Sequence, residues 1–389
     1  LAIEFCLEQA GLKADDLDYV VYYEKPFLKF ERILQSSLAT FPKSYEVFRE
    51  GMVAWLSEKL WAQNLISDRI GVHPKKVLAI DHHASHAASA YYASPFDDAA
   101  VLTVDGVGEW ATATTGVGSG HNLTLQREIR FPHSLGLLYS AFTAYLGFEV
   151  NEGEYKVMGM APYGKPRHVE KVWNLLTLGD DGSFRLNMEY FSFHYSARHT
   201  YNHRFVELFG PERPPGLHFF TRESGYPSYF GPKPADYEQL ADRNEYYADI
   251  ASSIQRVTEE VLLHMARALH KETGKTRLCM AGGVALNSVA NGRILRETPF
   301  KELYVQPAAG DGGGAVGAAL YPYHQLLGQP RRFVMEHAYW GKSYSQGESV
   351  DWLRSENIAH EVLSSEDRML DRVVESLTRG EVVGWHQGR

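Results

Sequence analysis

Two histidines four residues apart, followed by an aspartate that closes an apolar run, constrain this chain more than any other feature. The spacing of His82 and His86 places both rings on one face of a helix, about 6 Å apart at Cβ. The apolar run 99–104 then leads into Asp105, which stands in a glycine-bounded turn. Two imidazoles and one or two carboxylates suit a divalent first-row metal such as Fe(II), Mn(II) or Zn(II) better than a closed structural zinc site, which normally uses thiolates.

A second aspartate and a third histidine bear on this metal hypothesis. Asp311 lies far downstream in a glycine loop, 308–319, that opens a helix of small residues, and it is a candidate further ligand. A lone HxxxH pair is more often a chance spacing than a ligand set. His83 leaves a second pairing open, His83 with His86, although its geometry is poorer. The glycine-flanked Asp105 is the feature that favours a metal site.

Composition and charge place the chain among ordinary globular proteins of the cytoplasm. Of its 389 residues, 44% are hydrophobic and 22% charged, and the length exceeds what one compact domain usually holds. No apolar run is long enough to predict a membrane span. The net charge of -9 argues against nucleic acid as the main partner. Cys6 and Cys279 lie in apolar periodic segments, which favours buried free thiols over a disulfide framework.

Both ends of the sequence resemble the interior of a longer protein. There is no initiator methionine, and residues 1–11 read as the middle of a helix rather than as a signal peptide. Residues 380–389 stop just after an apolar segment that is expected to be a strand. We therefore expect a fragment of a longer protein.

Hydrophobic periodicity predicts an α/β chain. Helices are expected at 1–11, once or twice within 30–64, at 133–148 with Ser134 as the N-cap, and at 243–271. Strands are expected at 18–23, 77–80, 99–104, 110–117, 123–129, 278–281 and 303–305, of which the three between 99 and 129 form an antiparallel meander. Residues 165–240 are expected to be a long irregular insertion that could shape a substrate cleft. Residues 345–385 read as a helix, strand, helix and strand that border a second unit.

Three glycine turns indicate a phosphate-binding cleft. A strand, a glycine pair and a helix let backbone N–H groups at the helix N-terminus hold phosphate without a Cβ in the way. The glycines concerned are Gly106, Gly108, Gly282, Gly283, Gly312 and Gly313. The turns at 282 and 312 fit neither a P-loop nor a Rossmann fingerprint, and each alone is equally typical of close helix–strand packing. Together, the three turns are typical of a nucleotide cleft between two subdomains.

Three polar residues are further candidates for cofactor binding. Asn287 could hydrogen-bond a ribose or a base. Lys156 could counter phosphate charge, and Glu154 could orient a nucleophile or a ribose. A solvated surface turn is the alternative for Glu154 and Lys156. Neither a Ser/His/Asp triad nor a nucleophilic cysteine is indicated.

Four sequence blocks, taken together, resemble a known enzyme family. They are HHASHAASAYYASPFDDAAVLTVDGVGE (82–109), FPHSLGLLYSAFTAYLGFEVNEGEYKVMGMAPYG (131–164), AGGVALNSVANG (281–292) and AAGDGGGAVGAAL (308–320). They resemble the carbamoyltransferases of the nodulation-factor and antibiotic-tailoring type, the NodU/CmcH family. The resemblance implies an α/β fold of the ASKHA (actin-like) class, related to the universal tRNA threonylcarbamoyl-transfer enzyme. Two ribonuclease-H-like halves would surround a nucleotide and metal cleft.

The resemblance also implies a domain organisation. Residues 1–330 would form the ASKHA-type carbamoyltransferase domain, without the family's first strand and hairpin loop and with 165–240 as an insertion. Residues 331–389 would be a linker and the start of a C-terminal YrdC-like domain, most of which is missing from the chain. The complete protein would then be the enzyme, rather than this fragment alone.

The same resemblance implies a chemistry. By motif position, His82, His86, Asp105 and Asp311 would be the ligands of Fe(II), and His82, His86 and Asp105 would belong to the catalytic site. Family members use carbamoyl phosphate and ATP to make carbamoyl-adenylate, and pass the carbamoyl group to a hydroxyl of a sugar or natural product. The metal would polarise the carbamoyl-adenylate, and Asp105 could help to remove the acceptor proton.

Expected partners are therefore small molecules, namely carbamoyl phosphate, ATP and a hydroxylated acceptor. Neither a membrane nor a nucleic acid is expected, and a homodimer is an open alternative. Two other classes of function compete with this one. The first is a tRNA-modifying or sugar-kinase-like ASKHA enzyme, and the second is a nucleotide-binding regulatory module whose metal is structural.

Overall fold

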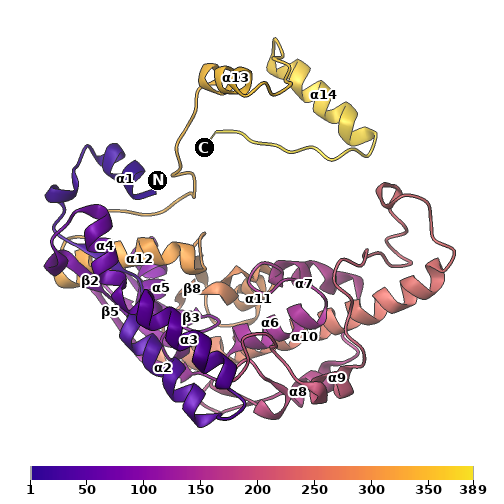
Figure 1. Ribbon diagram of the computed structural model, residues 1–389, viewed down its shortest axis with the longest axis horizontal. Coiled ribbons are helices and arrows are strands. Elements are labelled where there is room, and N and C mark those ends of the chain that lie inside the picture. Colours follow the sequence, from indigo (N-terminus) through magenta and orange to yellow (C-terminus); the bar gives the residue numbers. More distant parts are fainter. Residues whose placement is uncertain (1, 389) are drawn as a thin grey trace. The chain divides into compact units, whose positions relative to one another are not determined.

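A computed structural model describes residues 2–388, which divide into two compact units (Figure 1). Lys13–Met335 forms the larger unit, and residues 2–12 with 336–388 form the smaller one. Helices and strands alternate along the larger unit, so the predicted α/β class is confirmed. Within residues 2–388, none of the helices is both long enough and apolar enough to cross a membrane.

The centre of the larger unit is a mixed five-stranded sheet with the order β5-β4-β3-β8-β9. The strands are β3 (Asp98–Val104), β4 (Ala111–Ser119), β5 (Asn122–Arg130), β8 (Arg277–Ala281) and β9 (Glu302–Val305). The first three form the predicted antiparallel meander, and β8 pairs in parallel with β3 and with β9. Because β3 and β8 run in parallel, their carboxyl ends meet at one edge of the sheet.

Side chains of β3 alternate between two apolar layers, as the period of a strand requires. Ala100, Leu102 and Val104 face the large core that contains α6 (Leu135–Tyr145) and α10 (Tyr237–Thr273). Ala99 and Val101 face a second core that contains residues of α5 (His82–Tyr91). The sheet is thus covered on both faces at β3, and α10 is the long helix that runs to the right of Figure 1. This helix begins at Tyr237, six residues before the predicted start.

Close packing of α5 on α12 (Gly314–Tyr321) depends on a glycine. A Cβ added at Gly317 would lie 1.7 Å from the carbonyl oxygen of Ser85 and 2.9 Å from the nitrogen of Ser89. Only glycine permits two helix backbones to approach so closely. The helix that carries both histidines therefore lies directly against the helix that follows Asp311.

A parallel pair of short strands, β1 (Val20–Tyr22) and β2 (Val77–Ala79), precedes α5. Three helices separate the two strands, where the sequence predicted one or two: α2 (Pro26–Ala39), α3 (Tyr45–Ser57) and α4 (Ala62–Ile70). Strand β1 was expected to be buried but is only half-buried, since its one paired neighbour is β2. Strand β2 leads into the histidine helix as predicted.

Residues 165–240 contain several short elements where a long irregular insertion was expected. They are α8 (Val169–Trp173), β6 (Leu176–Leu178), β7 (Phe184–Leu186) and α9 (His203–Phe209), and the helix α7 (Glu154–Met160) precedes them. The strands β6 and β7 form a hairpin. Tyr195, His199 and Tyr201 line an open cavity of about 560 Å³ in this segment.

Short single-turn helices and one more α-helix complete the larger unit. The α-helix is α11 (Ser288–Glu297), and Pro322–Leu326 forms a π-helical turn. The 3-10 turns are Ala14–Asp16, Lys59–Trp61, Pro74–Lys76, Ala161–Tyr163, Met188–Tyr190, Ser228–Phe230, Gly283–Leu286 and Asp311–Gly313.

The smaller unit contains α1 (Ala2–Ala10), α13 (Gln346–Ser355) and α14 (Glu366–Thr378). The two strands predicted within 345–385 are wrong, because residues 356–364 and 380–388 form no strand in the described chain. Val362 and Val382 are 52% and 96% exposed. A strand needs a hydrogen-bonded neighbour, and these segments lack one among residues 2–388.

The two cysteines differ in their surroundings. Cys279 is fully buried in β8, as predicted. Cys6 is exposed on α1, so the prediction that it is buried is wrong. The apolar period of α1 does not decide burial here, since none of the described residues of that helix is buried.

Candidate metal centre

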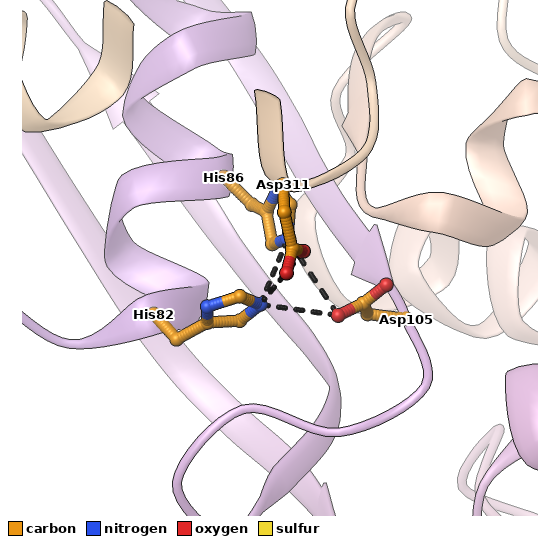
Figure 2. Close-up of side chains that lie close together, drawn as sticks. All are labelled: His82, His86, Asp105 and Asp311. Atoms are coloured by element: carbon orange, nitrogen blue, oxygen red, sulfur yellow. Dashed lines mark hydrogen bonds and ion pairs between the residues drawn. The ribbon is translucent and has the colours of Figure 1, made fainter. Parts of the chain in front are cut away.

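The side chains of His82, His86, Asp105 and Asp311 converge on one point (Figure 2). Their nearest donor atoms all lie within 4.8 Å of one another. His82 Nε2 lies 3.1 Å from Asp105 Oδ2, 3.0 Å from His86 Nε2 and 3.5 Å from Asp311 Oδ1. His86 Nε2 lies 3.6 Å from Asp311 Oδ1 and 3.7 Å from Asp105 Oδ2. The structure thus brings together the four residues that the sequence analysis grouped.

Three separate segments supply these side chains. One turn of α5 separates the two histidines and turns both rings to the same side (Figure 2). Asp105 follows β3 directly, and its Oδ1 accepts a hydrogen bond of 2.9 Å from the backbone nitrogen of Gly283. Gly283 follows β8, so the parallel pairing of β3 with β8 is what allows this bond. Asp311 lies in the glycine turn directly before α12 and is the exposed member of the cluster.

Contacts with the histidines favour ionised carboxylates at this point, against the effect of burial. Burial alone would raise the pKa of Asp105, but contacts with His82 and His86 outweigh it and hold the pKa well below its usual range. Contact with His86 also lowers the pKa of Asp311. Burial alone would lower the pKa of His86, but Asp105 and Asp311 raise it to about 9. Both aspartates therefore favour the negatively charged form, and a bound cation would take the place of a proton on His86.

His83 does not belong to the cluster, so the alternative pairing of His83 with His86 is wrong. Its Nδ1 lies 2.6 Å from the hydroxyl of Thr103, and its Nε2 lies 2.9 Å from the carbonyl of Ala111. Burial lowers its pKa to about 3, which keeps the ring neutral. Its position fixes α5 against β3 and β4.

The donor set fits a divalent first-row metal ion. Two imidazole nitrogens and two carboxylate oxygens are ligands that Fe(II), Mn(II) and Zn(II) share. Three of the four residues are buried and Asp311 is exposed, so the point is closed on one side and accessible on the other. The Nδ1 atoms of His82 and His86 are buried and have no hydrogen-bond partner within residues 2–388. Helix packing, rather than a second hydrogen bond on each ring, therefore holds the imidazoles in place.

Most of the predicted phosphate-binding glycines also serve close packing. A Cβ at Gly282, where φ is 96°, would lie 2.3 Å from Val104 O, and a Cβ at Gly313 would lie 2.0 Å from Ala308 O. A Cβ at Gly108 would lie 3.0 Å from His82 Cβ. Gly106 and Gly312 have more space, with no described atom nearer than 3.9 Å. Phosphate binding by these turns stays a prediction.

The three polar candidates for cofactor binding have partners within the protein. Asn287 caps α11 by accepting a hydrogen bond from Ala290 N, and it exchanges two further bonds with Gln255. Glu154 is half-buried and accepts a hydrogen bond of 2.7 Å from Ser140 Oγ. Lys156 is exposed, with its Nζ 5.7 Å from the centre of the Tyr155 ring. Their roles toward a nucleotide stay predictions.

Three residues that support the cluster were not predicted in that role. The hydroxyl of Ser134, the predicted N-cap of α6, also lies 2.6 Å from the carbonyl oxygen of Gly106. Gly136 allows α6 to approach Asp105, because a Cβ there would lie 2.7 Å from the Asp105 carbonyl oxygen. Glu109 binds the start of the histidine helix. The sequence signal for Glu109 was its place at the end of the block that begins with His82.

Comparison with known proteins assigns the family. Residues 1–320 match the family model described as "Carbamoyltransferase N-terminus". The chain belongs to this carbamoyltransferase family. It is 45% identical over its whole length to an uncharacterized protein of Synechocystis sp., of which it covers 61%. It is 31% identical, again over its whole length, to the nodulation protein NolNO of Sinorhizobium fredii, of which it covers 51%.

A third relative and two solved structures extend the comparison. The nodulation protein NolO of Bradyrhizobium diazoefficiens is 31% identical over 80% of this chain and 50% of its own length. The carbamoyltransferase chain thus spans about half to three fifths of these curated relatives. It is similar in fold to HypF of T. kodakarensis, with a TM-score of 0.33 and 15% identity over 68% of this chain and 38% of that one. The second solved structure is that of a ROK family glucokinase from Streptomyces griseus. Its superposition on this chain gives a TM-score of 0.25, with 15% identity over 66% of this chain and 70% of that one.

Proposed function

We propose that the complete protein containing this chain is an ATP-dependent O-carbamoyltransferase that modifies a hydroxyl group of a sugar or natural product. The observation that carries the proposal is the cluster of two histidines and two aspartates in a chain of the carbamoyltransferase family. The glycine turns at Gly106, Gly283 and Gly312 adjoin this cluster in sequence and support a nucleotide beside it.

Carbamoyl activation and carbamoyl transfer make up the proposed reaction. Water first cleaves carbamoyl phosphate into carbamate and phosphate. A carbamate oxygen then bonds to the α-phosphorus of ATP, and the bond from that phosphorus to the β-phosphate breaks, which gives carbamoyl-adenylate and pyrophosphate. The oxygen of the acceptor hydroxyl then bonds to the carbamoyl carbon, and the bond from that carbon to the phosphate oxygen of AMP breaks. AMP leaves with the electron pair, and the hydroxyl proton passes to a base or to water. The product is a carbamate ester.

Four residues would hold the metal ion, for which we propose Fe(II): His82, His86, Asp105 and Asp311. When bound, a divalent ion supplies Lewis-acid polarisation of a carbonyl or phosphoryl oxygen. The low pKa of Asp105 and its bond to Gly283 favour a role as a fixed anionic ligand. They disfavour Asp105 as the group that removes the acceptor proton, because a base with a low pKa takes up protons weakly.

The orientation of the site follows from its exposure. Asp311 is the exposed member of the cluster, whereas His82, His86 and Asp105 lie behind it. Substrates would therefore approach from the Asp311 side, where the exposed Gly312 before α12 leaves space that a side chain would otherwise fill. This arrangement suits an anionic phosphate compound better than an apolar ligand.

Product analysis tests the proposed reaction. The complete protein, loaded with Fe(II), is incubated with carbamoyl phosphate, ATP and a panel of glycosides and hydroxylated metabolites. We expect AMP and pyrophosphate to form, and one acceptor to gain the mass of one carbamoyl group. Formation of ADP in place of AMP would indicate a kinase and contradict the proposal.

A ligand substitution tests the metal's role in that reaction. His86→Ala should lose both bound iron and carbamoyl transfer while its circular dichroism spectrum stays that of the wild type, because the polar contacts of the His86 ring are with the other residues of the cluster. His360→Ala, in an exposed segment of the smaller unit, is the matched control and should keep both. Full transfer activity in a metal-free His86→Ala protein would end the catalytic hypothesis.

A further inference from the structure

We infer that Glu109 is a positioning residue of the metal centre: its buried carboxylate fixes the backbone of His82 and thereby sets the affinity of the cluster for a divalent ion. The inference rests on the metal site of the proposed function and does not require carbamoyl transfer. Nothing in the pattern of ligands themselves assigns this role, because Glu109 is not one of the four converging side chains.

The contacts of Glu109 are with backbone rather than with side chains. Its carboxylate is buried, at 6% exposure, and both of its oxygens lie 3.1 Å from the backbone nitrogen of His82. Oε1 also accepts a hydrogen bond of 2.7 Å from the backbone nitrogen of Lys25. Glu109 therefore joins the start of α5 to the residue that precedes α2.

The His82 N–H is a group that the helix itself leaves without a partner. The first four N–H groups of an α-helix have no intrahelical acceptor, and a capping side chain usually satisfies one of them. Asp81 occupies the N-cap position of α5, but its side chain makes no capping hydrogen bond within the described chain. Glu109 performs this function from 27 positions away in sequence.

The imidazole rings depend on the helix backbone for their orientation. Metal-binding histidines usually donate their second ring N–H to a carboxylate or carbonyl, which fixes the ring. For both His82 and His86, Nδ1 is buried and lacks a partner among residues 2–388. With no second bond on either ring, a shift of the first turn of α5 would move His82 Nε2 relative to Asp105 Oδ2, which lies 3.1 Å away.

The surroundings of Glu109 favour its negative charge and its position beside α5. Gly108 lets the loop approach α5, since a Cβ there would lie 3.0 Å from His82 Cβ. Arg32 is 7% exposed and lies over the ring of Phe131 at 5.1 Å. Burial lowers the pKa of Arg32 to about 10, and the negative charge of Glu109 opposes this shift. The guanidinium of Arg32 is thus a positive charge near the Glu109 carboxylate. A buried negative charge at a helix N-terminus is also favoured by the helix dipole.

Asp81 provides a matched control for the charge alone. It lies at the same end of α5, carries the same charge and forms an ion pair of 2.8 Å with Lys25 Nζ. Its side chain is 52% exposed, however, and makes no bond to the His82 nitrogen. Removing Asp81 therefore removes a negative charge near the helix N-terminus but leaves the acceptor of the His82 backbone N–H in place.

Cobalt titration of the metal-free complete protein tests the inference. Co(II) serves as the probe because its visible absorption spectrum reports on ligand geometry as well as on occupancy. Glu109→Ala should weaken Co(II) affinity about 10- to 100-fold and alter the spectrum. Glu109→Gln keeps one carbonyl oxygen as an acceptor and should give a smaller loss. Asp81→Ala should change the affinity less than about fivefold, the effect of an exposed charge on a helix dipole.

Two results would overturn the inference. One is wild-type affinity with a wild-type spectrum in folded Glu109→Ala, and the other is an equal loss of affinity in Asp81→Ala. If Glu109→Ala does not fold, Glu109→Gln decides: weaker binding with an altered spectrum supports the inference, and unchanged binding overturns it. His86→Ala separates this outcome from the site itself, because it should abolish Co(II) binding whether or not Glu109 matters. None of these readouts depends on carbamoyl transfer.

Discussion

Replacing Gly317 by alanine should separate the two helices that carry the metal cluster. A Cβ at this position would lie 1.7 Å from the carbonyl oxygen of Ser85, which stands between His82 and His86 on α5. Real Cβ atoms essentially never lie nearer than 3.0 Å to such a neighbour, so the gap has to widen by the 1.3 Å between these values. The atoms that the new Cβ would meet belong to the backbone of α5, which cannot rotate away as a side chain can. One of the two helices therefore has to move.

The expected loss of stability follows from two opposing effects. Overpacking a close contact costs about 1–3 kcal/mol, and alanine recovers about 1 kcal/mol because it favours a helix over glycine. We expect a net loss of up to about 2 kcal/mol in the free energy of unfolding. Asp311 precedes α12 and lies 3.5 Å from His82 Nε2, so movement of α12 should also weaken Co(II) binding, by about tenfold or more.

Gly159→Ala is the matched control for this substitution. Gly159 lies in α7, is exposed, and has no described atom within 4 Å of an added Cβ. The same change should therefore stabilise the protein by about 0.5–1 kcal/mol through helix propensity alone. Urea unfolding followed by tryptophan fluorescence measures stability, and Co(II) titration of the metal-free protein measures the site. If Gly317→Ala gained stability as Gly159→Ala does and bound Co(II) normally, the close contact of α5 with α12 would be refuted.

Two further substitutions and labels test the surroundings of the cluster. Ser134→Ala should lower the free energy of unfolding by about 1 kcal/mol, because the hydroxyl caps α6 and contacts Gly106 O. Ser345→Ala, at the N-cap of the exposed helix α13, is the control and should lower it less. Equal losses in urea unfolding would contradict the role of Ser134 beside Asp105. Burial raises the pKa of the Cys279 thiol to about 12, whereas Cys6 is exposed. At pH 8, iodoacetamide should therefore label Cys6 alone in the native protein and both cysteines in urea. Labelling of Cys279 in the native protein, detected by mass spectrometry, would contradict its burial.

Local patterns predicted the elements that surround the site. The strand period and the turn signals between 99 and 129 predicted the meander, and β3, β4 and β5 confirm it. Ser134 was predicted to be the N-cap of α6, and its hydroxyl accepts the bond from Leu137 N. Such signals operate over a few residues and need no knowledge of the rest of the chain.

The choice among three histidines required contacts that are distant in sequence. His83 differs from its neighbours because Thr103 and the carbonyl of Ala111 occupy its two nitrogens. That assignment depends on the rotation of α5 against β3 and β4, which the spacing of the histidines does not fix. Glu109 was not given its role for the same reason: its partner is a backbone N–H, and every residue has one.

The errors in the smaller unit have another physical cause. The apolar residues near Val362 and Val382 satisfy a strand pattern, yet both side chains are exposed and their segments pair with no strand among the described residues. Cys6 is exposed although α1 is amphipathic. A pattern of apolar residues predicts which face seeks a partner, but burial and strand formation require that partner to be present.

The distance in sequence between the four ligands means that a bound metal ion would join segments that assemble separately. Asp311 is synthesised long after His86, and its carboxylate reaches the ring of His86 only when β8 has joined β3 and α12 has docked on α5. An ion held by all four side chains would clamp a very long loop, and its binding would stabilise the completed structure by mass action. Metal loading would then favour the completed structure over partly assembled ones, while the metal-free chain can still reach the same fold.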